Sequence, residues 1–174
     1  MRLFIAILLP PVLQPAVSAA ASHLHERMGV RLLPAENYHL TLRFIGDADE
    51  TAAKKMGDAL ASVRFAPFTV RLRGAGAYPS VHFPRAIFIS GESEGAKMLA
   101  DSIEVALSPF NLKKEKFSVH LTIARSKGAG DIGEFLQKTG EVGSFEVKSV
   151  ALMKSVLLPQ GAAYEVLREY RAEE

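Results

Sequence analysis

The chain carries one short pattern of chemically active residues twice. His-Leu-Thr-Leu at residues 39–42 recurs as His-Leu-Thr-Ile at residues 120–123. Histidine readily gives and takes a proton near neutral pH, and a threonine hydroxyl donates a hydrogen bond to an anionic oxygen. Two copies of such an element predict a site in which His39 and His120 face each other across a reacting atom. That arrangement suits acid–base catalysis.

Both copies have the alternation of polar and apolar residues that is typical of a β-strand. Residues two apart on a strand project from the same face, about 6.6 Å apart along the chain. His39 and Thr41 therefore share one face, while the leucines between and after them point to the core. The same holds for His120 and Thr122. Together the two pairs offer two imidazoles for proton transfer and two hydroxyls for the oxygens of a tetrahedral anion, which favours cleavage of a phosphate ester.

A single His-x-Thr on a strand is more often structural than functional, and the duplication is what favours a functional pair. Zinc binding is the competing interpretation, because histidine is a common zinc ligand. The motifs bring no carboxylate or cysteine at ligand spacing, and the chain contains no cysteine. The sequence therefore excludes a disulfide, a thiol nucleophile and a thiolate metal site. We expect no metal and no other cofactor.

Length and composition predict one ordered folding unit. The 174 residues suffice for one core, or for two small lobes that share a cleft. Hydrophobic residues make up 48% and charged residues 23%, as in ordered globular proteins. Lysine and arginine number 21 against 19 for aspartate and glutamate. Affinity for nucleic acid must therefore come from local placement of charge rather than from an overall basic field.

The N-terminus allows two interpretations. Arg2, the apolar run at 3–9 and the small residues at 18–21 resemble a secretory signal. However, the apolar run is short and is cut by Pro10 and Pro11, which fits a buried strand that ends at a turn better. No other stretch approaches the roughly 18 apolar residues that a membrane span needs. We expect a cytoplasmic protein that does not contact a membrane.

Apolar periodicity predicts the remaining elements. The predicted helices cover residues 12–28, 49–63 and 99–107, and a short one follows Asp131. The predicted strands cover residues 37–45, 68–72, 86–89, 117–124, 145–157 and 164–171. We predict an α+β fold, with a single domain over 1–174. Two pseudo-symmetric lobes, divided near residue 80, would carry antiparallel-rich sheets that flank a central cleft, with helices on the outer faces.

Together these motifs resemble the 2H phosphoesterase superfamily, and within it the RNA 2′,3′-cyclic phosphodiesterases long called 2′-5′ RNA ligases. The resemblance covers nearly the whole chain. Its segments follow the family's order and lie at residues 2–7, 34–46, 74–79 and 119–125, and at Ser155 with 159–165. Three positions depart from the family pattern. Leu33 stands where an aromatic residue is common, Val119 where proline is common and Phe88 where tryptophan is common.

The resemblance implies hydrolysis of a terminal 2′,3′-cyclic phosphate to a 2′-phosphomonoester without a metal ion. His39 and His120 would be the catalytic pair, and similarity to the family makes His39 the proton donor and His120 the acceptor. The near-symmetry of the two motifs leaves this polarity open. Thr41 and Thr122 would hydrogen-bond the phosphoryl oxygens as charge accumulates on them.

Three further residues are predicted to bind substrate. Arg43 follows the alternation of the first motif, so its side chain should reach the cleft and attract the phosphate or the adjoining backbone. Arg125 has the opposite alternation to the second histidine, and either a bulge brings it inward or it forms a surface salt bridge. Tyr78 could stack on a base, and core packing is an equal alternative.

Two further groups of residues lie outside the motifs. The lysine-rich segment 113–116 either guides an RNA end toward the cleft or forms a solvated turn. The histidines at 23, 25 and 82 are expected to take no part in the chemistry.

Three functions are compatible with such a site. The leading one is hydrolysis of cyclic phosphate ends of RNA. A second keeps the same site but runs the transesterification backward, joining a cyclic phosphate to a 5′ hydroxyl as a 2′-5′ linkage without ATP. The high activity of water disfavours this joining. A third is a nucleotide- or RNA-binding module with little turnover, which the two intact histidines argue against. The expected partners are RNA ends or small cyclic nucleotides, and we expect a monomer.

Overall fold

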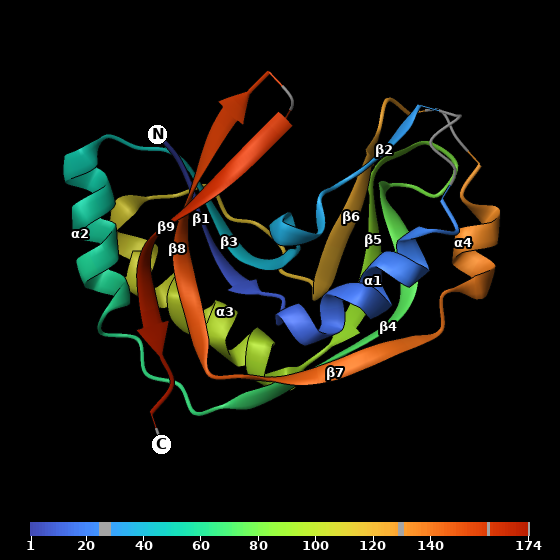
Figure 1. Cartoon of the computed structure of the whole chain (residues 1–174). Helices are drawn as coiled ribbons and strands as arrows, with labels where there is room; N and C mark the ends of the chain where they lie inside the picture. The colour runs from blue at the N-terminus through green and yellow to red at the C-terminus, as the bar shows by residue number, and fades with distance from the viewer. Residues whose placement is uncertain (25–28, 129–130, 160, 174) are drawn as a thin grey trace.

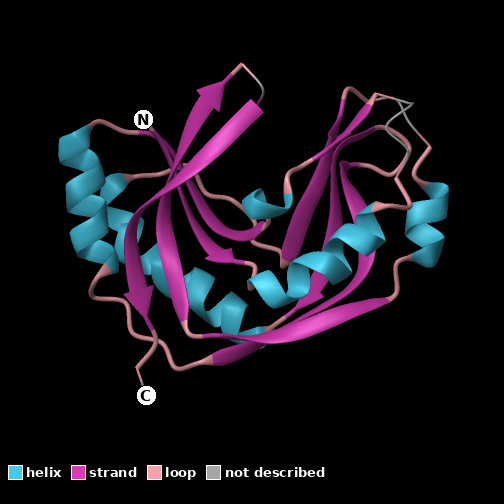
Figure 2. Ribbon diagram, in the orientation of Figure 1, coloured by secondary structure: helices cyan, strands magenta, loops and turns pink. Residues whose placement is uncertain are grey.

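One antiparallel sheet organises the molecule. The computed structural model describes residues 1–24, 29–128, 131–159 and 161–173. Within these residues nine strands form one sheet in the order β7-β4-β5-β6-β3-β1-β8-β9, and β2 is attached to β6. Every strand pair is antiparallel. Helices lie on the outside of this sheet (Figures 1 and 2), so the predicted α+β class is confirmed.

The first motif lies in one half of the sheet. The strands of this half are β1 (Arg2–Leu8), β3 (His39–Asp47), β8 (Ser149–Leu158) and β9 (Gly161–Arg171). Its helices are α2 (Glu50–Leu60) and α3 (Glu94–Leu107). The predicted cap of α2 is confirmed, because the Asp49 carboxylate accepts a hydrogen bond from the backbone N of Ala52 at 2.7 Å.

The second motif lies in the other half. The strands of this half are β2 (Val30–Leu32), β4 (Phe68–Pro79), β5 (Pro84–Glu92), β6 (His120–Ser126) and β7 (Glu141–Val147). Its helices are α1 (Gln14–Ala21) and α4 (Gly133–Lys138). Short 3₁₀ turns lie at Pro11–Leu13, Ala35–Asn37 and Ser108–Phe110. Helix α1 is shorter than predicted, and residues 25–28, which include His25, lie outside the described residues.

The two halves are not two consecutive parts of the sequence. Strands β1 and β3 come from the first 47 residues, yet β1 pairs with β8, which begins at Ser149. Helix α1 precedes β3 in the chain but contacts β6 and β7 of the other half. The predicted boundary near residue 80 is therefore wrong. The apolar patterns identified the strands, but strand order depends on pairing between residues far apart in the sequence.

The N-terminal segment is a central strand of the sheet, which confirms the strand interpretation. Leu3, Ile5 and Ile7 of β1 are buried in the main core, beneath Ile103 of α3 and its neighbours. Burying each such side chain stabilises the fold by about 1.5–3 kcal/mol. Among the described residues, no helix combines the length and the apolar character that crossing a membrane would require.

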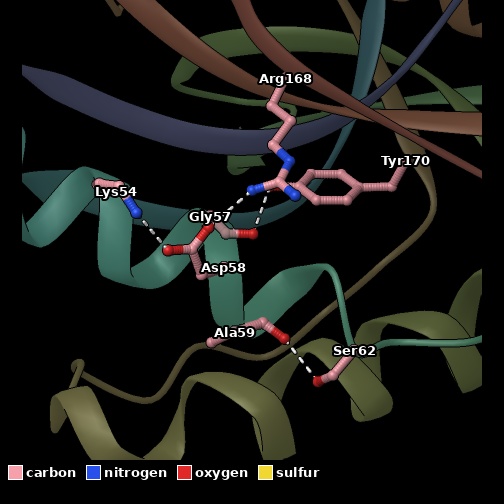
Figure 3. Close-up of polar contacts among 7 residues, drawn as sticks. All are labelled: Lys54, Gly57, Asp58, Ala59, Ser62, Arg168 and Tyr170. Carbon is pink, nitrogen blue, oxygen red and sulfur yellow. Dashed lines mark hydrogen bonds and ion pairs between the residues drawn. The ribbon is translucent and has the colours of Figure 1, made fainter.

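Polar contacts attach α2 to the edge strand β9 (Figure 3). The Tyr170 hydroxyl donates to the carbonyl oxygen of Gly57 at 3.0 Å, and the Arg168 guanidinium lies 3.0 Å from the Asp58 carboxylate. Lys54 contacts the same carboxylate at 2.8 Å. These contacts fix the outer layer of the half that carries the first motif.

Candidate active site

The two motif strands meet at one pair of leucines. Leu40 of β3 lies directly opposite Leu121 of β6, and both are buried in the core. Residues opposite each other on an antiparallel pair point to the same face. The histidine and threonine of each motif alternate with these leucines, so all four lie on the other face. This register makes His39 and His120 diagonal neighbours, which lie about 7–8 Å apart in a regular pair.

Each motif strand has an extra residue directly after its threonine. The pairing of β3 with β1 skips Leu42, and the pairing of β6 with β5 skips Ile123. Over their first six residues the two strands also have the same sequence of half-buried, buried and exposed positions. A bulge of this kind reverses the alternation of side chains beyond it. Phe44 and Arg125 therefore point to the motif face, and Arg43 points away from it.

Arg43 was predicted to reach the cleft and attract the phosphate, and the structure gives its guanidinium acidic partners within the protein. Its side chain is 5% exposed, and its Nε lies 2.7 Å from Oε2 of Glu104 in α3. Its Nη1 lies 3.5 Å from Oε2 of Glu115, and its terminal nitrogens donate to the carbonyl oxygens of Phe44 and Lys113. The bulge reversed the alternation, so the guanidinium is paired with acids, although Arg43 also lines the hollow that Thr41 and His120 line. This guanidinium joins β3 to α3 and to the segment that leads into β6.

Arg125 is in the position predicted by the bulge alternative. The bulge turns its side chain to the motif face, and its positive charge lowers the pKa of both His39 and His120. Among the described residues, the Arg125 guanidinium forms no ion pair, so its charge is free for an anionic ligand. Within the part of the chain that the structure describes, Arg125 does not form the surface salt bridge that was the other predicted alternative.

His39 is oriented by the backbone two residues earlier. Its Nδ1 lies 2.7 Å from the carbonyl oxygen of Asn37. A carbonyl only accepts, so Nδ1 carries the proton and Nε2 is left for chemistry. The rings of Phe4 and Tyr164 each lie 5.0 Å from the imidazole. Burial lowers the pKa of His39 below 6.5, the Asn37 carbonyl opposes this, and the charges of Arg125 and His120 lower it further.

His120 is oriented in the same way. Its Nδ1 lies 3.0 Å from the carbonyl oxygen of Ser118, again two residues earlier, and 3.1 Å from the Ser118 hydroxyl. That hydroxyl is 2.8 Å from the hydroxyl of Tyr78. The rings of Tyr78 and Phe88 flank the imidazole at 5.3 and 5.0 Å. Burial lowers the pKa of His120, and the Arg125 charge acts in the same direction against the Ser118 carbonyl.

Residues of both motifs line the same cavity. A hollow of about 150 Å³ has Thr41 from the first motif and His120 from the second in its wall. Phe44, Asp101 of α3 and Ser118 are also part of its lining. The two motif strands thus present a hydroxyl and an imidazole to one space. The face that carries the two motifs holds two imidazoles, two threonine hydroxyls and the Arg125 guanidinium, groups that can transfer protons and stabilise a phosphoryl group.

Comparisons with known proteins identify relatives of the chain. Residues 7–88 match the family model described as LigT-like phosphoesterase. The RNA 2′,3′-cyclic phosphodiesterase of Aeropyrum pernix is 38% identical over 157 residues, which cover 85% of the chain and 89% of that protein. The chain belongs to the LigT-like 2H phosphoesterase family.

Two further relatives extend the similarity along the whole chain. The RNA 2′,3′-cyclic phosphodiesterase of Archaeoglobus fulgidus is 31% identical over 175 residues, covering 98% of this LigT-like chain and 99% of that protein. The crystal structure of a Thermus thermophilus protein has a TM-score of 0.87 at 28% identity, with all of both chains covered. The predicted family and fold class are therefore confirmed.

Tyr78 contacts His120 and Ser118 and is also exposed to solvent. Its side chain is 44% exposed, and its ring stacks on Phe88 at 4.7 Å. Its hydroxyl reaches His120 through Ser118. Neither of the two predicted roles, base stacking or core packing, describes these contacts fully. In this LigT-like phosphoesterase Tyr78 belongs to the surroundings of the second histidine.

Sequence analysis missed four residues that contact the histidines. Phe4 and Tyr164 pack on the first imidazole, and Asn37 and Ser118 hold the two Nδ1 atoms. A polar or small residue two positions before each histidine was visible in the sequence, but its carbonyl bond was not. Phe4 and Tyr164 become neighbours of His39 only through the pairing of β1 with β3 and β8, and of β8 with β9.

Of the remaining candidates, Lys116 borders the hollow that His120 lines. His82 is exposed on the loop between β4 and β5, and the lysines of 113–116 are exposed. Within the described ranges, no group of three histidine, aspartate or glutamate side chains is arranged to hold a metal ion. His25 belongs to the residues that the structure does not describe.

Proposed function

We propose that the protein hydrolyses the 2′,3′-cyclic phosphate end of RNA to a 2′-phosphomonoester. One observation carries the proposal: the Leu40–Leu121 pair sets the two His-x-Thr strands side by side, with each histidine Nδ1 bound to a backbone carbonyl. Relatives whose similarity covers 85% and 98% of this chain are named RNA 2′,3′-cyclic phosphodiesterases, which supports the same substrate.

The proposed reaction is an in-line displacement at phosphorus. A neutral imidazole accepts a proton from water through Nε2 as the water oxygen bonds to phosphorus. The bond between phosphorus and the 3′ oxygen breaks, and a protonated imidazole on the other side donates its proton to that oxygen. The products are a 3′ hydroxyl and a 2′-phosphomonoester. Each proton transfer contributes about 10²–10⁴ to the rate.

The other residues of the site would stabilise charge. Thr41 and Thr122 would donate hydrogen bonds to the non-bridging oxygens, and Arg125 would offset the negative charge. The family resemblance assigns His39 as proton donor and His120 as acceptor. In the alternative joining reaction the 5′ hydroxyl of an acceptor would take the place of water, and the 3′ oxygen would again leave with the donated proton. Among the described residues no three histidine, aspartate or glutamate side chains are grouped so that they could hold a metal ion, and we propose a reaction without one.

We also propose that the enzyme acts as a monomer in the cytoplasm. One chain supplies both motifs and both walls of the cavity, so the site needs no second copy to be complete. RNA ends, or small cyclic nucleotides of the same chemistry, would be its substrates in that compartment.

Determining the product end of one RNA tests this function. An oligonucleotide with a 2′,3′-cyclic phosphate is incubated with the protein, with and without an acceptor RNA that has a 5′ hydroxyl. We expect a 2′-phosphate end in both cases. A joined product as the main outcome would replace hydrolysis by ligation, and an unchanged end with bound RNA would leave a binding module.

A further inference from the structure

A second arginine faces the site from β2. Arg31 lies directly opposite Arg125 in the pairing of β2 with β6. Opposite residues of an antiparallel pair share a face, and Arg125 points to the motif face, so Arg31 points there too. Like charges in this position repel each other and destabilise the pair. Folding by itself does not favour an exposed pair of like charges on a strand of only three residues.

No described acid neutralises this pair. The ion pairs of the described residues use other arginines, and neither Arg31 nor Arg125 has a carboxylate partner among them. Each of the two guanidinium groups is therefore available to bind an anionic group of a ligand, which would also relieve their repulsion.

The side chain of Arg31 reaches across to the other half of the sheet. Its guanidinium lies against Gly161 of β9, where a Cβ atom would collide with it. Nearby, the Asn37 side chain donates to the carbonyl oxygen of Ala162 at 3.2 Å. Arg31 therefore lies where β2 and the β8–β9 hairpin approach each other, above the face that carries the histidines.

Arg125 and its partner Arg31 lie some distance along the sheet from His120, where the reacting phosphate would bind. Five residues lead from His120 to Arg125, which is roughly 16 Å of strand at 3.3 Å per residue. The bulge turns Arg125 to the face of the histidines, and its charge lowers the pKa of both. Arg31 extends instead toward Gly161. The Arg125 guanidinium is thus placed to bind the reacting phosphate. The Arg31 guanidinium is placed to bind the next anionic group along the substrate.

We propose that Arg31 binds a second phosphate of the substrate, the one on the 5′ side of the terminal nucleoside. The next anion along an RNA strand is this phosphate, so the subsite would make the enzyme prefer RNA ends to small cyclic nucleotides. The inference rests on the proposed function and names the substrate class of that same site.

Two substrates that differ by one phosphate test the subsite. Cytidine 2′,3′-cyclic phosphate is compared with its 5′-phosphorylated form, by kcat/KM and by dissociation constant in calorimetry. Charge-assisted hydrogen bonds of this kind change affinity by about tenfold or more. We expect the wild-type protein to prefer the 5′-phosphorylated form by about that factor. Arg31→Gln should remove the preference and leave the unphosphorylated substrate unchanged.

A matched control variant separates the effect of removing Arg31 from a general effect of removing one positive charge. Arg73 is exposed on β4, away from the motif strands, and Arg73→Gln should keep the full preference. Equal loss for both substrates in Arg31→Gln would overturn the proposal, and so would a wild-type protein without preference. If neither compound is hydrolysed, the proposed function fails, and the ratio of dissociation constants still decides the subsite.

Discussion

Each of the two histidines donates its Nδ1 proton to the carbonyl two residues earlier, so the same nitrogen of each ring is left for substrate. The surroundings differ: Phe4 and Tyr164 enclose His39, while Ser118 and Tyr78 link to His120 through hydroxyls. The two rings are thus oriented alike in unequal surroundings, and catalysis requires one of them to be neutral while the other is protonated.

The pH dependence of kcat/KM follows from the two lowered pKa values. Burial keeps both rings neutral at pH 7 in the free protein, and catalysis needs one of them protonated. As pH falls below about 6.5, the singly protonated form gains population until the second ring is protonated as well. We expect a bell-shaped profile with its maximum on the acid side of 6.5. A profile without an acid or an alkaline limb would contradict this.

Arg125→Gln should move the same profile to higher pH. Removing a positive charge near both imidazoles favours their protonated forms, so both pKa values should rise. The measurement is kcat/KM against pH for the variant and the wild type, with Arg73→Gln as a distant control. A shift toward lower pH would exclude an electrostatic effect of Arg125 on the histidines.

Chelation should not abolish turnover. Aromatic rings, hydroxyls and carbonyls surround the histidines, and among the described residues no carboxylate is placed beside them as a third metal ligand. The rate of cyclic phosphate hydrolysis is measured before and after dialysis against EDTA. Complete loss of activity that an added divalent ion restores would disprove metal-independent catalysis.

The bulges at Leu42 and Ile123 decide which side chains of the motif strands reach the site. Without them Arg43 would lie beside the first motif, as strict alternation predicts. With them Arg43 is buried against Glu104, and Arg125 joins the site instead. The local pattern predicted both strands correctly. It did not predict the bulges, because a bulge is defined by the register of the neighbouring strand.

The ion pair of Arg43 should contribute to stability rather than to substrate binding. Glu104→Gln removes the closest anion from a buried cation and should lower the free energy of unfolding by about 1–3 kcal/mol. Arg43→Met in the same background should restore part of the loss, because it removes the uncompensated charge. Urea unfolding measures both. If Arg43→Met instead reduces kcat/KM at unchanged stability, Arg43 binds substrate after all.

The whole molecule brings together segments that are distant in sequence. The half of the sheet that carries His39 is completed by β8 and β9 from the end of the chain, and Tyr164 reaches the first histidine in this way. Sequence periodicity and capping residues predicted the fold class and most elements. Strand order could not be predicted, because pairing between distant segments sets it. The positions of Phe4, Tyr164 and Arg31 depend on that order and could not be predicted either.

The central claim is that His39 and His120 act on one phosphorus atom, and the rates of the two single variants and the double variant test it most directly. Hydrolysis of a 2′,3′-cyclic phosphate is measured for His39→Ala, His120→Ala and both together, with the exposed His82→Ala as control. Each single variant should lose about 10²-fold or more in kcat, and the double variant should lose little beyond the worse single one, because the pair works as a unit. Near-normal turnover in either single variant, with folding unchanged, would contradict the account.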